Sequence, residues 1–327
     1  MSESTDILAG YFRLMNLNGA SHVYREAVRS GALDALRSGR RTAEAVGQAC
    51  GTVHRPTQLL LDALSALGLL NKNDEGYALD PLAQMLLMGD YRNLGDEYWA
   101  QLPAWLKTGE PLVKMDDIAQ REAHYQAQAA ILGWMLTPAA RCAAHIMRAN
   151  WVSEAARILD IGAGSAIWSL TLARETPTAT VTAVDWPSVL EVAAETAGQF
   201  GLLDRLTKLP GNYHEIEFPR GWFDVAILGN VTHLERRSDN VALLAKTRGA
   251  LKPGGRVVIF DIFPGQSRGD LNRALYSLGL ALRTKHGHVY SVQEFDSMLR
   301  ESGFGPPQLF PLEVPPFALG MLTAATL

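Results

Sequence analysis

Two closely spaced glycines follow the first apolar run of the C-terminal half. The segment 160–166 reads Asp-Ile-Gly-Ala-Gly-Ser-Ala, in which Gly162 and Gly164 let the backbone turn sharply and approach a ligand closely. The segment departs from the dinucleotide fingerprint G-x-G-x-x-G, because Ile167 stands where the third glycine belongs. Asp160, just before this turn, suits a ligand that carries an amino group. A tight strand-to-helix turn without a ligand is the structural alternative.

A second acidic residue ends the next apolar run. Asp185 follows an expected strand at 178–184 and lies 23 residues after Gly162. A carboxylate at this place accepts hydrogen bonds from ribose hydroxyls. The spacing alone allows an NAD, FAD or adenosyl ligand, whereas an acid that merely precedes the helix opened by Pro187 needs no ligand. Trp186 beside it is a candidate to pack against an adenine, or part of the core.

These groups need elements that bring them to one edge of the molecule. From residue 155 onward, β-branched and apolar runs alternate with helical patterns, which predicts a parallel, doubly wound α/β sheet. The expected strands are 156–161, 178–184, 205–210, 223–230 and 256–261, with closing strands at 309–314 and 317–326. Ligands of such sheets bind beyond the carboxyl ends of the strands, so the residues after these strands are the candidates for a site.

The N-terminal part is predicted to be mainly helical. Residues 11–50 read as two or three helices, and a further helix carries an apolar stripe between Leu59 and Leu67. A polar turn at 71–76 between two short apolar pieces then predicts a helix–turn–helix with a small β-wing. We therefore expect a winged-helix-like domain at 1–95, a helical linker and pocket region at 96–150, and the α/β domain at 151–327.

Taken together, these segments resemble the class I S-adenosylmethionine-dependent methyltransferases, and among them the small-molecule O-methyltransferases of plants and bacterial natural-product pathways. The resemblance covers nearly the whole chain. It depends on short sequence segments that occur in the order expected for the family. In the N-terminal half these segments are 31–36, 41–44 and 59–70. In the C-terminal half they are 160–164, Asp185, 251–255 and 301–304. It implies a Rossmann-like methyltransferase sheet, an N-terminal winged-helix domain that forms a homodimer, S-adenosylmethionine as cofactor and S-adenosylhomocysteine as its product.

The resemblance also assigns cofactor contacts. Asp160, Gly162 and Gly164 would lie along the methionine and ribose part of the ligand, and Asp185 would hold the ribose hydroxyls. The remaining candidates for the cofactor site are Trp186, Gly211, Asn212, Tyr213 and Asn230. Asn212 stands where relatives usually have an aspartate, and its amide can hydrogen-bond an adenine amino group without a charge. Two further departures are Gly229 in place of a frequent lysine and Ala166 in place of a frequent glycine.

The family's catalytic histidine falls on His233, and an acid that brackets it falls on Asp261. In this fold their strands are neighbours about 4.8 Å apart, so both side chains can reach one spot beyond the sheet. A neutral imidazole, with an ordinary pKa of about 6.5, can take the proton of an acceptor hydroxyl. A carboxylate on the other ring nitrogen fixes the tautomer and stabilises the imidazolium. The structural alternative is a histidine that caps the helix after its strand.

One departure allows a different chemistry. Plant relatives carry a second acid in the segment that here reads Lys-His-Gly-His-Val-Tyr at 285–290. His233 with His286 or His288 would be a two-histidine site for divalent zinc or iron, which chelates a 2-oxo acid for C-methylation. Solvent-facing loop histidines are the alternative. The resemblance further places an acceptor pocket near Trp99, Trp134, Met135 and His288, where packing in the core is an equally good interpretation.

Composition excludes several classes of protein. The chain of 327 residues has 47% hydrophobic and 20% charged residues and a net charge of −4, which is typical of a soluble globule. Residues 1–95 carry 9 Lys and Arg against 10 Asp and Glu, and the helix that would enter a DNA groove, from His54 to about Gly68, offers only Arg55 as a fixed cation. A DNA-binding regulator is therefore disfavoured, and no nucleic-acid or membrane partner is expected. The acidic start and only two cysteines indicate a cytoplasmic protein. The small-molecule acceptor is what the family resemblance implies.

Overall fold

The computed structural model describes residues 3–87, 90–111, 118–263, 270–315 and 319–327. Contacts divide the chain into two compact units, Met1–Glu97 and Tyr98–Leu327, and each is described by itself. The two cysteines, Cys50 and Cys142, are both free and half-buried. Within the described ranges, every helix is too short or too polar to cross a membrane.

The first unit consists of helices and one β-hairpin. Its elements are α1 (Glu3–Arg29), α2 (Ala32–Arg37), α3 (Ala43–Cys50), α4 (His54–Ala66), β1 (Leu70–Asn73), β2 (Gly76–Leu79) and α5 (Pro81–Leu87). The hydroxyl of Thr42 accepts a hydrogen bond from the amide of Ala45 and caps α3, and Gly51 ends that helix with φ 66°. Both capping signals are readable in the sequence. Leu33 and Leu64 are fully buried in the core of this unit.

Helix α1 exposes a large apolar surface. Its exposed large side chains are Ile7, Leu8, Tyr11, Phe12, Leu14, Met15 and Leu17. Each of them is between 47% and 67% exposed. A patch of this kind on a soluble chain is typical of a surface that another protein chain covers.

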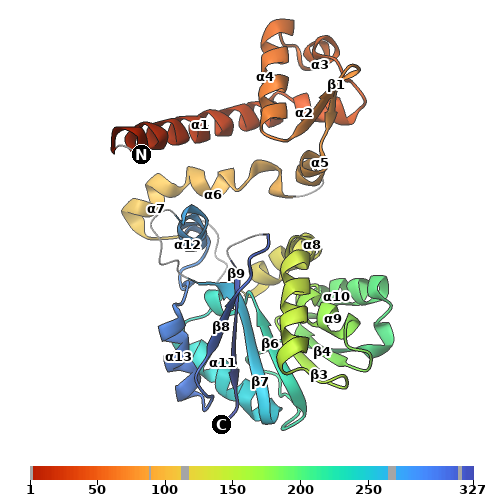
Figure 1. Cartoon of the computed structure of the whole chain (residues 1–327), viewed down its shortest axis with the longest axis vertical. Helices are drawn as coiled ribbons and strands as arrows, with labels where there is room; N and C mark the ends of the chain where they lie inside the picture. The colour runs from red at the N-terminus through yellow and green to blue at the C-terminus, as the bar shows by residue number, and fades with distance from the viewer. Residues whose placement is uncertain (1–2, 88–89, 112–117, 264–269, 316–318) are drawn as a thin grey trace. The chain divides into compact units, whose positions relative to one another are not determined.

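A seven-stranded sheet of order β5-β4-β3-β6-β7-β9-β8 forms the centre of the second unit (Figure 1). Its strands are β3 (Arg157–Ile161), β4 (Thr180–Asp185), β5 (Leu206–Pro210), β6 (Phe223–Gly229), β7 (Leu251–Ile262), β8 (Gln308–Pro311) and β9 (Leu319–Ala325). The first five strands are parallel, and β9 runs antiparallel between β7 and β8. The prediction of a doubly wound α/β sheet is confirmed.

Helices cover both faces of this sheet, with α8, α9 and α10 on one face and α11 and α13 on the other (Figure 1). The helices of the second unit, with α6 at its border, are α6 (Asp96–Ala100), α7 (Leu102–Thr108), α8 (Ile118–Asn150), α9 (Ile167–Arg174), α10 (Pro187–Phe200), α11 (Arg237–Ala250), α12 (Leu271–Arg283) and α13 (Val292–Glu301). Successive strand residues face opposite cores: Ile158 packs into one cluster and Leu159 into the other.

Several strand boundaries differ from the sequence expectation: β4 begins at Thr180 instead of 178, and β8 ends at Pro311 instead of 314. β7 begins at Leu251, not at 256, because Leu251 pairs with Phe223 before an irregularity in the register that takes up the Pro-Gly-Gly turn. β9 begins at Leu319, and the start of the expected strand at 317–318 lies outside the described residues. A capping box formed by Ser291 and Glu294 opens α13.

Candidate active site

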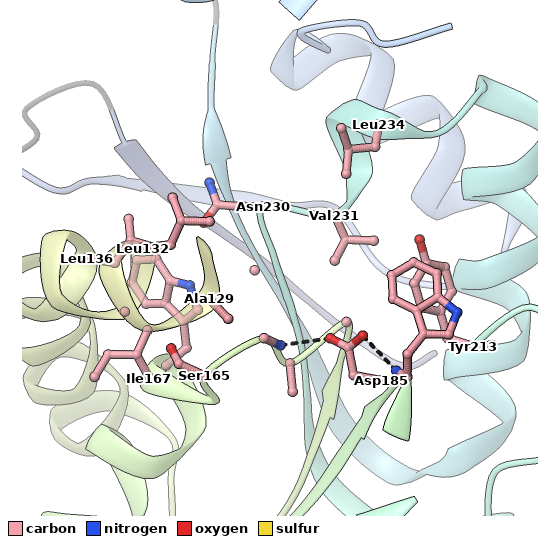
Figure 2. A pocket seen from close by; sticks show the side chains of 17 residues that line it. Ala129, Leu132, Leu136, Ser165, Ile167, Asp185, Tyr213, Asn230, Val231 and Leu234 are labelled. Carbon is pink, nitrogen blue, oxygen red and sulfur yellow. Dashed lines mark hydrogen bonds between the residues drawn. The ribbon is translucent and has the colours of Figure 1, made fainter. Parts of the chain in front are cut away.

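A cavity lies beyond the carboxyl ends of β3, β4 and β6 and encloses about 670 Å³, part of it open to solvent. Its lining includes the predicted residues Gly162, Gly164, Asp185, Trp186, Tyr213 and Asn230. The other residues around it are Ala129, Leu132, Gly133, Leu136, Ala163, Ser165, Ile167, Trp168, Gly229, Val231 and Leu234. Figure 2 shows Leu132 and Leu136 on the helix at one side, with Asp185 and Tyr213 towards the other.

The glycine turn approaches the neighbouring strand end closely. Gly162 and Gly164 have φ of 65° and 56°, in the left-handed region that side chains disfavour. A Cβ at residue 162 would lie 2.6 Å from a methyl of Val231. Ala166 ends the turn with φ 53°, although it carries a Cβ. The turn therefore depends on glycine at residue 162 for both conformation and space.

Asp185 is buried at the wall of the cavity. Its two oxygens accept hydrogen bonds from the amides of Gly164 and Trp186, each of 2.8 Å (Figure 2). Burial raises the pKa of this carboxyl to about 6, against the opposing effect of these amides. Each carboxylate oxygen has a second lone pair, so the group retains acceptor capacity for ligand hydroxyls.

Asp160 lies beneath the cavity and is fully buried. One oxygen accepts a hydrogen bond from the hydroxyl of Ser169, and the other has no hydrogen-bond partner among the described residues. Burial raises the pKa of Asp160 to about 7; the hydrogen bond from Ser169 opposes this shift, and the charge of Asp185 adds to it to a lesser extent. An orphaned buried acceptor of this kind fits a site that takes up a cationic or hydrogen-bond-donating ligand.

Helix α8 supplies a wall of the cavity that the sequence reasoning missed. Ala129, Leu132, Gly133 and Leu136 recur at helical spacing and face the cavity. A Cβ at residue 133 would lie 2.3 Å from the hydroxyl oxygen of Ser165, so the helix backbone packs directly onto the glycine turn. The sequence feature that could have revealed this wall is the stripe of small and apolar residues at positions i, i+3, i+4 and i+7.

The predicted acceptor residues are placed differently. Trp134 is 60% exposed on α8, and Met135 next to it is half-buried; neither lines the cavity. Trp99 lies against α12, where a Cβ at Gly279 would be 3.9 Å from its ring. His288 is exposed, with its side chain directed to Glu294.

The turn after β5 brings one of its three predicted residues to the cavity. Tyr213 lines it, and its hydroxyl donates to a buried oxygen of Glu235 at 2.6 Å. Asn212 folds back on its own turn, because its side chain accepts from the amide of His214 and donates to Glu215. Gly211, with φ 140°, donates its amide to the carbonyl of Asp185 and fixes this turn beside β4.

The turn after β6 contains a strained asparagine. Asn230 has φ 60°, and its buried side-chain oxygen has no partner among the described residues. Beside it, the indole of Trp168 stacks on Phe260 with ring centroids 3.9 Å apart. A Cβ at Gly229 would lie 2.4 Å from that indole, which gives a physical reason for glycine at this position.

His233 and Asp261 form a buried pair just beyond β6 and β7. The ring Nδ1 of His233 lies 2.8 Å from Oδ1 of Asp261. The same carboxylate accepts from the Thr232 hydroxyl at 2.7 Å and from the amides of His233 and Ile262 at 3.2 and 2.8 Å. A carboxylate with four donors is an acceptor, so Nδ1 carries the proton and Nε2 presents a lone pair. That lone pair faces the hydroxyl of Tyr276 at 3.1 Å.

The three histidines of the predicted alternative metal site do not converge. Nε2 of His286 contacts the guanidinium of Arg236, and Nε2 of His288 lies 3.2 Å from Glu294. The amide of His288 donates a hydrogen bond to the carbonyl of His233, but the His288 ring points to Glu294 and not to the His233 ring. In the part of the chain that the structure describes, no three His, Cys, Asp or Glu side chains are placed to hold a metal ion. The donor set for zinc or iron is therefore not assembled.

Fold and site together define a class I methyltransferase. Residues 120–305 match the O-methyltransferase domain family, and residues 12–89 match the O-methyltransferase dimerisation domain. The chain belongs to the O-methyltransferase domain family and is an S-adenosylmethionine-dependent methyltransferase.

Similar proteins agree with this assignment. The 3-hydroxy-5-methyl-1-naphthoate 3-O-methyltransferase of Streptomyces sahachiroi is 27% identical over 91% of this chain and 88% of its own length. The L-tyrosine C(3)-methyltransferase of Streptomyces lavendulae is 26% identical over 83% of this chain and 79% of its own. Human N-acetylserotonin methyltransferase, solved in complex with S-adenosylmethionine, has the same fold with a TM-score of 0.72, 20% identity and coverage of 100% and 98%.

Replacement of Gly162 by alanine tests the glycine turn. We expect Gly162→Ala to weaken S-adenosylmethionine binding at least tenfold and to cost about 1–3 kcal/mol of folding stability, because the new Cβ combines a disfavoured φ with a clash. Gly221→Ala is the matched control, since its φ of 57° is similar and its surroundings are open. Calorimetric affinity and thermal unfolding measure both effects. Equal losses of affinity in the two variants would contradict the expectation.

The buried acids predict a pH dependence of stability. Both pKa values are raised on folding, so the folded ligand-free protein binds more protons than the unfolded chain between about pH 4 and pH 7. Their contribution to stability is present at low pH and is lost as the pH rises through 6 and 7. Asp160→Asn should therefore raise the melting temperature at pH 8 more than at pH 5.5. The exposed Asp204→Asn is the control, and a difference independent of pH would refute the assignment.

Proposed function

We propose that this methyltransferase acts on the phenolic or enolic hydroxyl of a small molecule in secondary metabolism, with His233 as general base. The observation that carries this proposal is the buried His233–Asp261 pair, whose geometry leaves Nε2 as the proton acceptor. The naphthoate O-methyltransferase relative supports an aromatic acceptor.

The cavity residues support a binding mode for the cofactor. Asp185 would accept the ribose hydroxyls, and the orphaned oxygens of Asp160 and Asn230 suit the ammonium and its hydrogen-bond network. Trp186 and Tyr213 line the same cavity and would flank the adenine. When bound, S-adenosylmethionine supplies a methyl group that its sulfonium has already activated for in-line displacement.

The chain's own contribution is then to hold the acceptor and remove its proton. Nε2 of His233 takes the hydroxyl proton as the acceptor oxygen bonds to the methyl carbon and the carbon–sulfur bond breaks. Asp261 stabilises the imidazolium that forms and keeps the ring from rotating. The apolar residues of α8 line the cofactor cavity, whereas His233 and Asp261 are not among its lining residues. We further propose that residues 96–150 form the acceptor side of the site, supported by the contact of Trp99 with α12.

The N-terminal unit supports a homodimer. We propose that the exposed apolar face of α1 packs against a second copy within a winged-helix dimerisation domain. The helices, the hairpin β1–β2 and the match to the dimerisation domain all favour this arrangement.

The general-base role is tested with labelled S-adenosylmethionine and a panel of phenol, 1-naphthol, 3-hydroxy-1-naphthoate and 2-oxo acids. We expect methylation of a phenol, and a loss of at least about 100-fold in kcat for His233→Ala. His145→Ala on the exposed face of α8 is the control. Product analysis separates transfer to oxygen from transfer to carbon, and full activity of His233→Ala would overturn the role of this residue.

The dimer is tested on α1. Phe12→Asp should shift the mass measured by light scattering at micromolar concentration from dimer to monomer, because it buries a charge in the proposed interface. Asn16→Asp adds the same charge at a polar position and should leave the dimer intact. A wild-type monomer at this concentration would refute the proposal.

A further inference from the structure

The hydroxyl of Tyr276 contacts Nε2 of His233, the atom that accepts the proton in the proposed mechanism. The hydroxyl lies 3.1 Å from Nε2, and the two rings meet edge to face at 83° with centroids 5.6 Å apart. The residue comes from α12, more than 40 positions along the chain, so the contact is a tertiary one. A phenol hydrogen-bonded to Nε2 is the arrangement that a phenolic acceptor would adopt.

The His233 ring can accept only one hydrogen bond. Because Nδ1 is protonated and bound to Asp261, the lone pair of Nε2 is the ring's only hydrogen-bond acceptor. The Tyr276 hydroxyl donates to that lone pair. An acceptor hydroxyl cannot give its proton to Nε2 while this bond persists, so the two hydroxyls compete for one atom.

The surroundings of Tyr276 allow it to withdraw. The side chain is only half-buried, and the neighbouring Leu271 and Leu275 on α12 are 49% and 41% exposed. The helix is anchored near its C-terminal end, where Leu280 and Leu282 are buried and Trp99 packs at Gly279. No described residue in the N-terminal half of α12 is fully buried, but Tyr276 packs against the hydrophobic core from the side, so its withdrawal costs part of that packing.

We propose that Tyr276 competes with the acceptor for the proposed base: its phenol holds Nε2 in the acceptor-free enzyme, and an acceptor hydroxyl must displace it. This inference rests on the proposed role of His233. The free energy needed to displace Tyr276 is the same for every acceptor. Tyr276 therefore lowers the affinity for phenolic, enolic and aliphatic hydroxyls by a similar factor, and it keeps Nε2 hydrogen-bonded until an acceptor binds.

Tyr276→Phe tests the competition, because it keeps the ring and removes the hydroxyl. A neutral hydrogen bond of ordinary net strength corresponds to a three- to tenfold change in binding. We expect KM for 1-naphthol, or for the panel phenol with the highest rate, to fall three- to tenfold, with kcat within twofold of wild type. The same variant should bind an aliphatic analogue, 1-decalol, more tightly by a similar factor. Ser277→Ala, at the exposed next position of α12, is the control and should change neither constant.

A second measurement does not depend on any acceptor. Long-range proton–nitrogen NMR of the histidine rings reports whether Nε2 of His233 accepts a hydrogen bond, and its resonance should move to lower field in Tyr276→Phe and not in Ser277→Ala. An unchanged resonance overturns the contact. A tenfold fall in kcat at constant KM overturns the competition, since it would make the hydroxyl part of the chemistry. Failure of the general-base role shows separately, as retained activity of His233→Ala.

Discussion

One buried carboxylate, Asp261, organises the part of this enzyme that contains the proposed general base. Asp261 stands where β7 ends and accepts hydrogen bonds from the turn that follows β6, from the His233 ring and from its own next amide. Four donors around one charge offset much of the cost of taking it out of water. Because two of these donors belong to His233, the backbone and ring of the histidine are fixed by the same group. The amide of the loop residue His288 adds a further hydrogen bond to the carbonyl of His233.

The cofactor cavity combines two features that are unfavourable by themselves. Its acids, Asp160 and Asp185, are buried, and the pKa of each is raised by that burial. Its turns contain left-handed residues, among them Ala166 and Asn230, that carry side chains. The buried acids and the left-handed residues both lie where a positively charged ligand is expected to bind. Binding sites commonly retain perturbed carboxyl groups and strained backbone of this kind. The ligand would recover part of this free energy when it binds.

The sequence predicts the sheet well because each strand is a short apolar run with a clear stop, and parallel strands deliver their ends to one edge. The same logic brings Gly162, Asp185 and Asn230 to one cavity. The sequence pattern does not show which helical side chains point into the cavity, because that depends on how each helix is rotated about its axis. The large side chains of Trp134 and Met135 drew attention by type, yet Leu132 and Leu136 face the cavity. Nor does any local pattern reveal Tyr276, because its partner lies in a distant turn.

The stacked pair of Trp168 and Phe260 limits which residues can stand at position 229. The indole fills the space that any side chain at Gly229 would need. A side chain at 229 and the indole of Trp168 therefore cannot occupy this space together. A larger residue at 229 requires a smaller one at 168, so the two positions are coupled through packing alone.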